Sequence, residues 1–188
     1  MNFKNIFIIS GPSGAGEDSI IKGLEKIFPL EKIITTATRQ MRLGESQGNP
    51  YYFITKEIFQ EEIRKNEFFE YVEEDRNNFY GVTKKETERV LGLNKIILWK
   101  LDYKGVITAK KLFPESIAIL IDVPIEVIEE RIRRRDGVDE KYIQGRLEYA
   151  RGWYDNRDKF DYSIKNAEGR LDEAIQKVAE IIKKNISQ

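Results

Sequence analysis

A glycine-rich turn near the N-terminus is the first feature of the sequence that could do chemistry. The run is Gly11-Pro12-Ser13-Gly14-Ala15-Gly16, between an apolar segment typical of a buried strand and an amphipathic segment typical of a helix. In this context backbone N–H groups can surround a phosphate at the helix N-terminus, and the helix dipole adds attraction. The turn therefore predicts a phosphate-binding loop.

Two acidic residues follow the turn where such a loop usually carries a cation. In the full pattern, G-x-x-x-x-G-K-[ST], the lysine contacts phosphates and the hydroxyl binds Mg²⁺. Here Glu17 and Asp18 occupy those two positions. A carboxylate about 4 Å from a phosphate oxygen costs about 4 kcal/mol at an effective dielectric constant of about 20. Either the loop no longer binds nucleotide and its acids simply suit the helix dipole, or a cation comes from elsewhere.

Lys100 is the cation that the sequence offers. It follows the apolar run Ile96-Ile97-Leu98-Trp99, where a buried amine is costly without an anionic partner. We predict that Lys100 reaches the phosphates, or Glu17, from the neighbouring strand. Asp18 is then a candidate Mg²⁺ ligand, directly or through a water, because oxygen donors suit that ion. The alternative for Lys100 is a lysine at a strand end that extends into water.

Composition excludes several other chemistries. The chain has 188 residues and contains neither His nor Cys. Disulfides, Cys/His zinc sites, catalytic triads and cysteine nucleophiles are therefore excluded. Any catalysis must use carboxylates, amines, guanidinium groups, hydroxyls, the backbone or a metal ion.

Net charge and the lengths of apolar runs limit the binding partners and the location that we expect. The 32 Lys and Arg residues balance 32 Asp and Glu residues, which argues against general binding to nucleic acid or acidic membranes. The apolar run near the N-terminus is far shorter than the roughly 20 residues of a membrane span, and no signal-peptide cleavage pattern follows. We expect a cytoplasmic protein of one domain, with no nucleic-acid or membrane partner.

Strand-like and helix-like segments alternate along much of the chain. Short, β-branched apolar runs predict strands at residues 5–10, 95–101, 116–123 and 161–165. Helical spacing predicts helices over residues 19–28, stopped by Pro29, from near Tyr103, from near Pro124 and over residues 171–185. This alternation indicates an α/β fold with a parallel sheet, whose ligands bind at the carboxyl ends of the strands.

Two segments interrupt the alternation. Residues 35–94 are polar, aromatic and turn-rich, which predicts an inserted lobe of short strands and helices. Residues 131–151 form a heavily charged helical region that contains Gly137. The ordinary interpretation of such a charge run is a solvated surface.

Several further motifs occur in a fixed order. They are Thr38-Arg39-Gln40-Met41-Arg42-Leu43-Gly44-Glu45, Gly48-Asn49-Pro50-Tyr51-Tyr52-Phe53, Asn66-Glu67-Phe68-Phe69-Glu70, Phe79-Tyr80-Gly81, Leu101-Asp102-Tyr103-Lys104-Gly105, the run 131–135, Arg146-Leu147 and Asp161-Tyr162. Together with the glycine turn they resemble the guanylate kinases, a family of P-loop nucleoside-monophosphate kinases, over essentially the whole chain. The resemblance implies a three-layer P-loop fold with a parallel central sheet. Its core would be residues 1–34, 95–130 and 152–188, its GMP-binding lobe residues 35–94 and its helical lid residues 131–151.

The resemblance also implies an activity, namely phosphorylation of GMP by ATP with Mg²⁺. The implied GMP-phosphate ligands are Arg39, Arg42, Tyr51 and Tyr80, and the implied guanine ligands are Thr35, Glu70 and Asp102. The implied ATP site contains Gly11, Pro12, Ser13, Gly14, Ala15, Gly16, Glu17, Asp18, Ser19 and Asn166. The catalytic cations would be Arg39, Arg135 and Arg146, with Lys100 added. Arginine forks match phosphate oxygens, which agrees with these assignments, although an exposed ion pair is the plain alternative for any single one.

The departure from the family pattern looks like an exchange of charges. A cation is missing from the loop, and Lys100 stands where the family usually has an acidic residue. Two other functions remain open: a catalytically inactive binding module of the same fold, which would explain Glu17 and Asp18 without Lys100, and a kinase for a related small phosphate ester. Monomer and homodimer are also both open.

Overall fold

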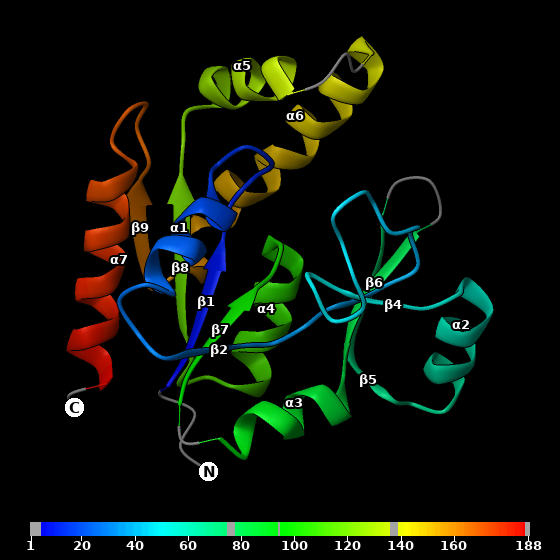
Figure 1. The fold of residues 1–188 in the computed structure, drawn as a ribbon. Helices are drawn as coiled ribbons and strands as arrows, with labels where there is room; N and C mark the ends of the chain where they lie inside the picture. The colour runs from blue at the N-terminus through cyan, green and yellow to red at the C-terminus, as the bar shows by residue number, and fades with distance from the viewer. Residues whose placement is uncertain (1–4, 75–77, 94, 136–138, 187–188) are drawn as a thin grey trace. The chain divides into compact units, whose positions relative to one another are not determined.

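The computed structural model describes residues 5–74, 78–93, 95–135 and 139–186, and Figure 1 shows its ribbon. The chain divides into two compact units. We call residues 31–97 the inserted unit and the remainder, residues 2–30 with 98–188, the core unit. The chain passes between the units within strands β2 (Leu30–Lys32) and β7 (Ile96–Lys100).

The core unit alternates strands and helices. Its elements are β1 (Ile6–Ser10), α1 (Glu17–Leu24), α4 (Tyr103–Leu112), β8 (Ile117–Asp122), α5 (Ile125–Arg135), α6 (Glu140–Asp155), a 3₁₀ turn (Arg157–Lys159), β9 (Tyr162–Lys165) and α7 (Leu171–Ile186). The sheet to which these strands belong has the order β2-β7-β1-β8-β9. β8 runs parallel to both β1 and β9. The predicted α/β fold with a parallel central sheet is confirmed.

Burial explains why these segments form strands. All five residues of β1 are buried, and so are the four central residues of β8. A strand with helices over both faces has no solvent face, so its sequence reads as a continuous apolar run and not as an alternation. α7 packs against α1 and β9, as its place beside them in Figure 1 indicates. β1 leads directly into the glycine turn, and Lys100 is the last residue of β7.

One predicted helix has different bounds in the structure. The apolar spacing predicts a helix over residues 19–28, but α1 begins at Glu17 and ends at Leu24. It begins early because Gly16, with φ of 98°, turns the chain into the helix and the acidic first turn suits the helix dipole. It ends early because the N–H groups of Lys26 and Ile27 bond to carbonyls three residues back, which tightens the last turn.

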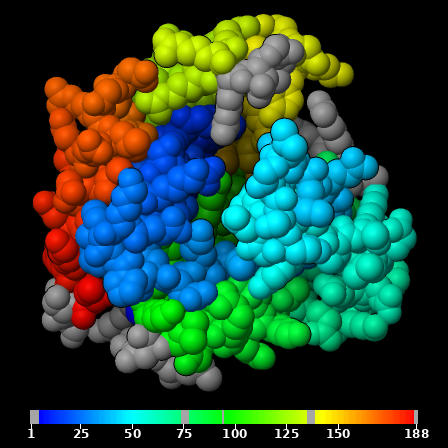
Figure 2. Space-filling model, viewed as in Figure 1, coloured from blue at the N-terminus to red at the C-terminus, as the bar shows by residue number. Residues whose placement is uncertain are grey.

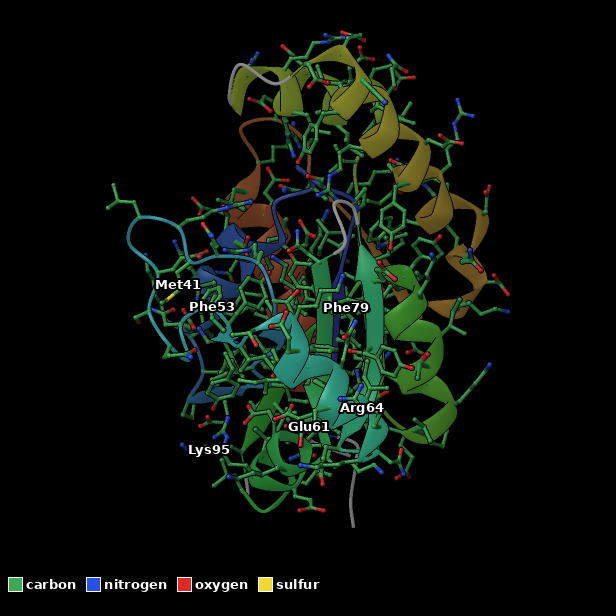
Figure 3. All side chains as sticks on the ribbon, turned by 90° about the vertical axis from the view of Figure 1, so that its right-hand side faces the viewer. Met41, Phe53, Glu61, Arg64, Phe79 and Lys95 are labelled. Atoms are coloured by element: carbon green, nitrogen blue, oxygen red, sulfur yellow. The ribbon has the colours of Figure 1, made fainter. Side chains whose placement is uncertain are left out.

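The inserted unit has a four-stranded sheet with the order β4-β3-β6-β5. Its elements are β3 (Thr36–Ala37), β4 (Tyr52–Phe53), α2 (Lys56–Arg64), β5 (Phe68–Glu74), β6 (Asn78–Thr83) and α3 (Lys84–Leu91). Phe59 of α2 packs between Phe68 and Phe79, with ring centres 4.1 and 5.5 Å away. Figure 3 labels Phe79 on β6 and Glu61 and Arg64 on α2. This aromatic cluster joins the helix to the sheet.

The loop between β3 and β4 lies at the surface. Met41 and Leu43 are exposed there, and Figure 2 shows this cyan segment on the face in view. Among the described residues no helix combines the length and apolar character that crossing a membrane requires.

Candidate functional site

The glycine turn connects β1 to α1 and requires glycine at two positions. Gly14 and Gly16 have φ of 89° and 98°, in the left-handed region that other residues rarely adopt. The N–H of Ala15 bonds to the carbonyl of Pro12 at 2.9 Å, which closes the turn. The sequence therefore forms a tight loop at a helix N-terminus, where backbone N–H groups favour an anion.

Two side chains from later in the chain fix this loop. Asn166 Nδ2 donates to the carbonyl of Ala15 at 2.7 Å. Arg131, on α5, donates to the carbonyl of Gly14 at 3.0 Å and to the carbonyl of Asn166 at 3.2 Å. These bonds hold the Gly14 and Ala15 carbonyls, so the peptide planes of the loop have defined orientations.

A cavity of about 450 Å³ opens on the loop within the core unit. Its lining residues are Ser13, Gly14, Gly16, Glu17, Asp18, Ser19, Lys100, Arg131, Asn166, Ala167, Glu168, Gly169 and Leu171. This volume lies in the range of sites that hold small molecules. The cavity thus gathers most of the predicted ATP-binding residues and adds the predicted cation.

Lys100 reaches the start of α1 from the end of β7. Its Nζ lies 2.7 Å from Oδ1 of Asp18, and the two side chains are 40% and 66% exposed. The acidic partner predicted for Lys100 was Glu17, but the ion pair in the structure is with Asp18. Lys100 also acts on Glu17 through its charge. Because exposed ion pairs contribute only about 0–1 kcal/mol, Lys100 can exchange Asp18 for another anion at little cost.

Glu17 points into a less solvated environment than Asp18. Burial raises the pKa of its carboxyl from 4.5 to about 7, against the attraction of Lys100 and with the repulsion of Asp18. A large share of Glu17 is therefore protonated near neutral pH. A neutral carboxyl does not repel phosphate as the charged form does, so the penalty expected from sequence is reduced.

The predicted phosphate ligands of the inserted unit surround Arg39. Its guanidinium makes two hydrogen bonds of 2.6 Å to Glu45, and it lies 5.0 Å from the ring centre of Tyr51. The Tyr51 and Tyr80 ring centres are 5.9 Å apart. Arg39, Tyr51 and Tyr80 thus lie together. Arg42 is exposed, and its N–H donates to Glu45 Oε2 at 2.8 Å, so Glu45 connects the two arginines of the motif.

Glu45 is a residue that the sequence reasoning did not assign. The Arg39 guanidinium lowers the pKa of its carboxyl to about 2, while Glu45 in turn raises the pKa of Arg39. The pair is therefore charged throughout the working pH range. Its place in the motif, six residues after Arg39, was the available signal.

The predicted base ligands of the inserted unit lie on or beside its strands. Thr35 precedes β3, and its carbonyl accepts the N–H of Tyr52 at 3.0 Å. Glu70 lies on β5 opposite Val82 of β6. Glu86, a second unassigned residue, is 4% exposed and accepts the N–H of Ile34 at 2.9 Å. It therefore holds the backbone that leads into Thr35.

Asp102 begins helix α4 in the core unit. Its Oδ1 accepts the N–H of Gly105 at 2.7 Å, and its Oδ2 accepts the hydroxyl of Tyr149 at 2.5 Å. Tyr149, from α6, is a third unassigned residue. Its partner is 47 residues away, and nothing local in the sequence indicates the pairing.

The two predicted lid arginines differ in what the structure describes. Arg146 lies on α6, where its Nε donates to the hydroxyl of Tyr142 at 3.2 Å. Arg135 ends α5, and its side chain lies outside the described residues. Arg131, which belongs to the same charged run, contacts the phosphate loop and was not given a role from sequence. A solvated-surface interpretation of this run is therefore incomplete.

The oxygen donors at the loop are compatible with Mg²⁺. Asp18 and Ser19 line the cavity, and Mg²⁺ usually takes one or two protein oxygens and completes its shell with phosphates and water. Within the described ranges, no cluster of three or more Asp, Glu, His or Cys residues forms a cage by itself. The donor set thus suits a metal ion that arrives with a nucleotide.

Comparison with known proteins gives a consistent family. The family model "Guanylate kinase" matches residues 3–185. A guanylate kinase of Rickettsia felis is 37% identical over 187 residues, covering 97% of this chain and 96% of the relative. A guanylate kinase of Fusobacterium nucleatum is 31% identical over 187 residues, covering 99% and 100%.

The solved structures agree at the level of fold. The crystal structure of guanylate kinase from Anaplasma phagocytophilum matches with a TM-score of 0.70 and 24% identity, over 95% of this chain and 84% of that one. Shikimate kinase from Acinetobacter baumannii matches with a TM-score of 0.54 and 14% identity, over 96% and 93%. From the family model and from relatives that align end to end, the chain belongs to the guanylate kinase family of nucleoside-monophosphate kinases, as the order of its motifs predicts.

Proposed function

We propose that the protein transfers the γ-phosphoryl group of ATP to GMP, giving ADP and GDP, and that Lys100 supplies the cation missing from the phosphate loop. A phosphate oxygen of GMP forms the new P–O bond, and the bond between the γ-phosphorus and the β–γ bridging oxygen breaks. The attacking oxygen is already anionic, so the reaction needs no general base. This suits a chain without histidine.

One observation carries the proposal about Lys100. Its Nζ lies 2.7 Å from the carboxylate of Asp18 inside the cavity lined by the glycine turn. A lysine at this place can bind the β- and γ-phosphates as the usual loop lysine does, since a compact ammonium acts as a point charge without a fixed direction. The ion pair with Asp18 keeps the ammonium beside the loop before nucleotide binds.

The two loop acids have different roles in this proposal. Glu17, with its raised pKa of about 7, is neutral in a large share of molecules near neutral pH, which lowers its repulsion of phosphate. Asp18 would exchange Lys100 for Mg²⁺ and hold that ion, directly or through water. When bound, Mg²⁺ withdraws charge from the transferring phosphoryl group. Asn166 would lie near the adenine.

The inserted unit would bind the acceptor. Arg39 and Arg42 bind the GMP phosphate with hydrogen bonds from Tyr51 and Tyr80, and the bond from Arg39 to Glu45 sets the plane of its guanidinium. Thr35, Glu70 and Asp102 would contact guanine. Adenine lacks the N–H donors that guanine offers to these carboxylates. Binding adenine would leave the carboxylates unpaired, which costs a few kcal/mol of binding free energy. Arg135 and Arg146 would stabilise the transferring group.

A coupled assay of ADP release with GMP and ATP tests the proposal. The wild type should turn over GMP, and Lys100→Ala should lower kcat/KM for ATP by at least about 100-fold, the loss of a charged phosphate contact. Lys65→Ala is the matched control, because Lys65 also makes an ion pair, of 2.6 Å with Glu61, in the inserted unit. It should retain full activity.

The outcomes separate the alternatives. A wild type without GMP-dependent turnover and without ATP binding in calorimetry would favour the inactive binding module. Turnover with a different phosphate ester and none with GMP would favour the related kinase. Activity that survives Lys100→Ala unchanged would remove the relocated lysine and leave the kinase.

A further inference from the structure

Helix α6 presents a tyrosine hydroxyl to a carboxylate that the proposed reaction uses. Tyr149 donates to Oδ2 of Asp102, while Oδ1 accepts the N–H of Gly105. An ionised carboxylate has about four acceptor positions. Two remain for a ligand after these bonds, and their directions are set by the two donors. The carboxylate is therefore held in one rotamer before any ligand binds.

The aromatic packing around Tyr149 makes this contact rigid. Its ring centre lies 5.5 Å from those of both Tyr103 and Trp153, and the Tyr103 and Trp153 rings are 5.1 Å apart. Trp153 Nε1 donates to the buried hydroxyl of Ser10 at 2.8 Å. These contacts seat α6 on α4 and the end of β1 without using the Tyr149 hydroxyl. The hydroxyl donates to Asp102.

The same helix carries a candidate lid arginine. Arg146 precedes Tyr149 by three residues, so the two side chains are neighbours on one face of α6. One turn of α6 therefore carries both Arg146, which would contact the transferring phosphoryl group, and Tyr149, which bonds to Asp102.

We infer that Tyr149 is a positioning residue for acceptor binding, which orients the Asp102 carboxylate toward guanine and ties α6 to that carboxylate. The inference rests on the proposed function, because it needs Asp102 to contact the base. The acceptor gains affinity because the carboxylate does not have to give up rotamer freedom when the base binds.

Tyr149→Phe tests the inference, since it removes one hydroxyl and keeps the ring. We expect KM for GMP to rise about tenfold, the usual effect of losing a hydrogen bond to a charged group. KM for ATP should stay within about twofold, and kcat should change less than KM for GMP. A purely structural role would not produce this split between the two substrates.

Tyr154→Phe is the matched control on the same helix. The Tyr154 hydroxyl donates to the carbonyl of Val123 at 2.5 Å, so this variant also loses one short hydrogen bond from α6. It should lower stability to a similar degree and leave KM for GMP unchanged. In an Asp102→Asn background, Tyr149→Phe should have little further effect on KM, because the two residues act through one contact.

The outcomes are distinct. A wild type that turns over GMP while Tyr149→Phe keeps its KM for GMP overturns the inference and leaves the proposed function. Equal rises in KM for GMP in Tyr149→Phe and Tyr154→Phe, or fully additive effects with Asp102→Asn, also overturn it. A wild type that neither binds nor phosphorylates GMP removes the proposed function and this inference with it.

Discussion

The ammonium of Lys100 and the carboxylate of Asp18 lie 2.7 Å apart, although 82 residues separate them in the chain. One comes from the end of β7 and the other from the first turn of α1. The contact brings a positive charge to a loop that has lost its own lysine. The contact supports the proposal that a cation from the strand replaces the one missing from the loop.

Returning the cation to the loop should therefore rescue its loss from the strand. We expect the double variant Lys100→Ala/Glu17→Lys to have a kcat/KM for ATP at least about tenfold higher than Lys100→Ala alone. The reason is that a lysine at position 17 restores the G-x-x-x-x-G-K pattern. The coupled ADP-release assay measures it. Glu25→Lys in the Lys100→Ala background is the control, since it makes the same charge change at the exposed end of α1. Equal rescue by both variants would mean that only net charge matters.

Glu17 should make stability depend on pH. Its folded-state pKa, about 7, is above its ordinary value of 4.5 because of burial. The group therefore contributes stability that is complete below about pH 4.5 and lost as pH rises through 7. We expect Glu17→Gln to lose less unfolding free energy than the wild type between pH 5 and pH 8, measured by urea denaturation. Glu115→Gln, an exposed change, should keep the wild-type pH dependence. A Glu17→Gln curve parallel to that of the wild type would contradict the prediction.

Glu45 should matter for acceptor binding although it would not touch the acceptor. Glu45→Gln replaces a bidentate ion pair with one hydrogen bond, so the Arg39 guanidinium is held less firmly in its orientation. We expect KM for GMP to rise about tenfold with KM for ATP unchanged. Glu61→Gln, which removes the exposed partner of Lys65, should leave both constants unchanged. The idea fails if Glu45→Gln raises both constants equally.

The pair also predicts acid behaviour. Arg39 holds the pKa of Glu45 at about 2, below its ordinary value of 4.5. Its stabilisation is therefore complete above about pH 4.5 and is lost as pH falls toward 2. Glu45→Gln should lose less stability than the wild type over that interval in urea titrations at pH 5 and pH 3. Equal losses would place the acid sensitivity elsewhere.

Glu86 should be one of the most sensitive positions of the inserted unit. Its buried carboxylate accepts the Ile34 N–H and two hydrogen bonds of 2.8 Å from Arg89. We expect Glu86→Ala to lower the free energy of unfolding by about 2–3 kcal/mol, since it leaves a backbone donor unsatisfied. Glu88→Ala, two residues along the same helix and exposed, should change it by less than about 0.5 kcal/mol. Urea denaturation of both variants decides the matter.

The sequence predicted the central strands of the sheet well because β1 and β8 are apolar on both faces. It did not predict β2, whose three residues Leu30-Glu31-Lys32 form no apolar run. Residues 5–10 and 116–123 contain β1 and β8 with only a residue or two to spare at the ends. The position of Lys100 near the glycine turn could be predicted because Lys100 ends an apolar run, and the carboxyl ends of parallel strands lie at one edge of a sheet. The end of α1 could not, because residues 25–28 continue the apolar spacing while the backbone tightens into a turn.

The contacts that the sequence did not reveal are long-range. Arg131 bonds to Gly14 across 117 residues and Tyr149 to Asp102 across 47. Arg131 lies in a run of like charges, where the sequence does not distinguish one half-buried arginine from its exposed neighbours. Tyr149 lies in a helix rich in aromatic residues. The spacing of these residues does not distinguish a tyrosine that only packs its ring from one whose hydroxyl makes a specific hydrogen bond. Only the three-dimensional structure identifies these two residues among their neighbours.

The bond from Asn166 to the carbonyl of Ala15 spans 151 residues. During translation the glycine turn therefore leaves the ribosome long before Asn166 is added to the chain. Arg131 also appears long after the loop that it holds. Nascent chains should thus carry an unfinished phosphate loop until both residues have emerged, and the capacity to bind ATP should arise abruptly only then.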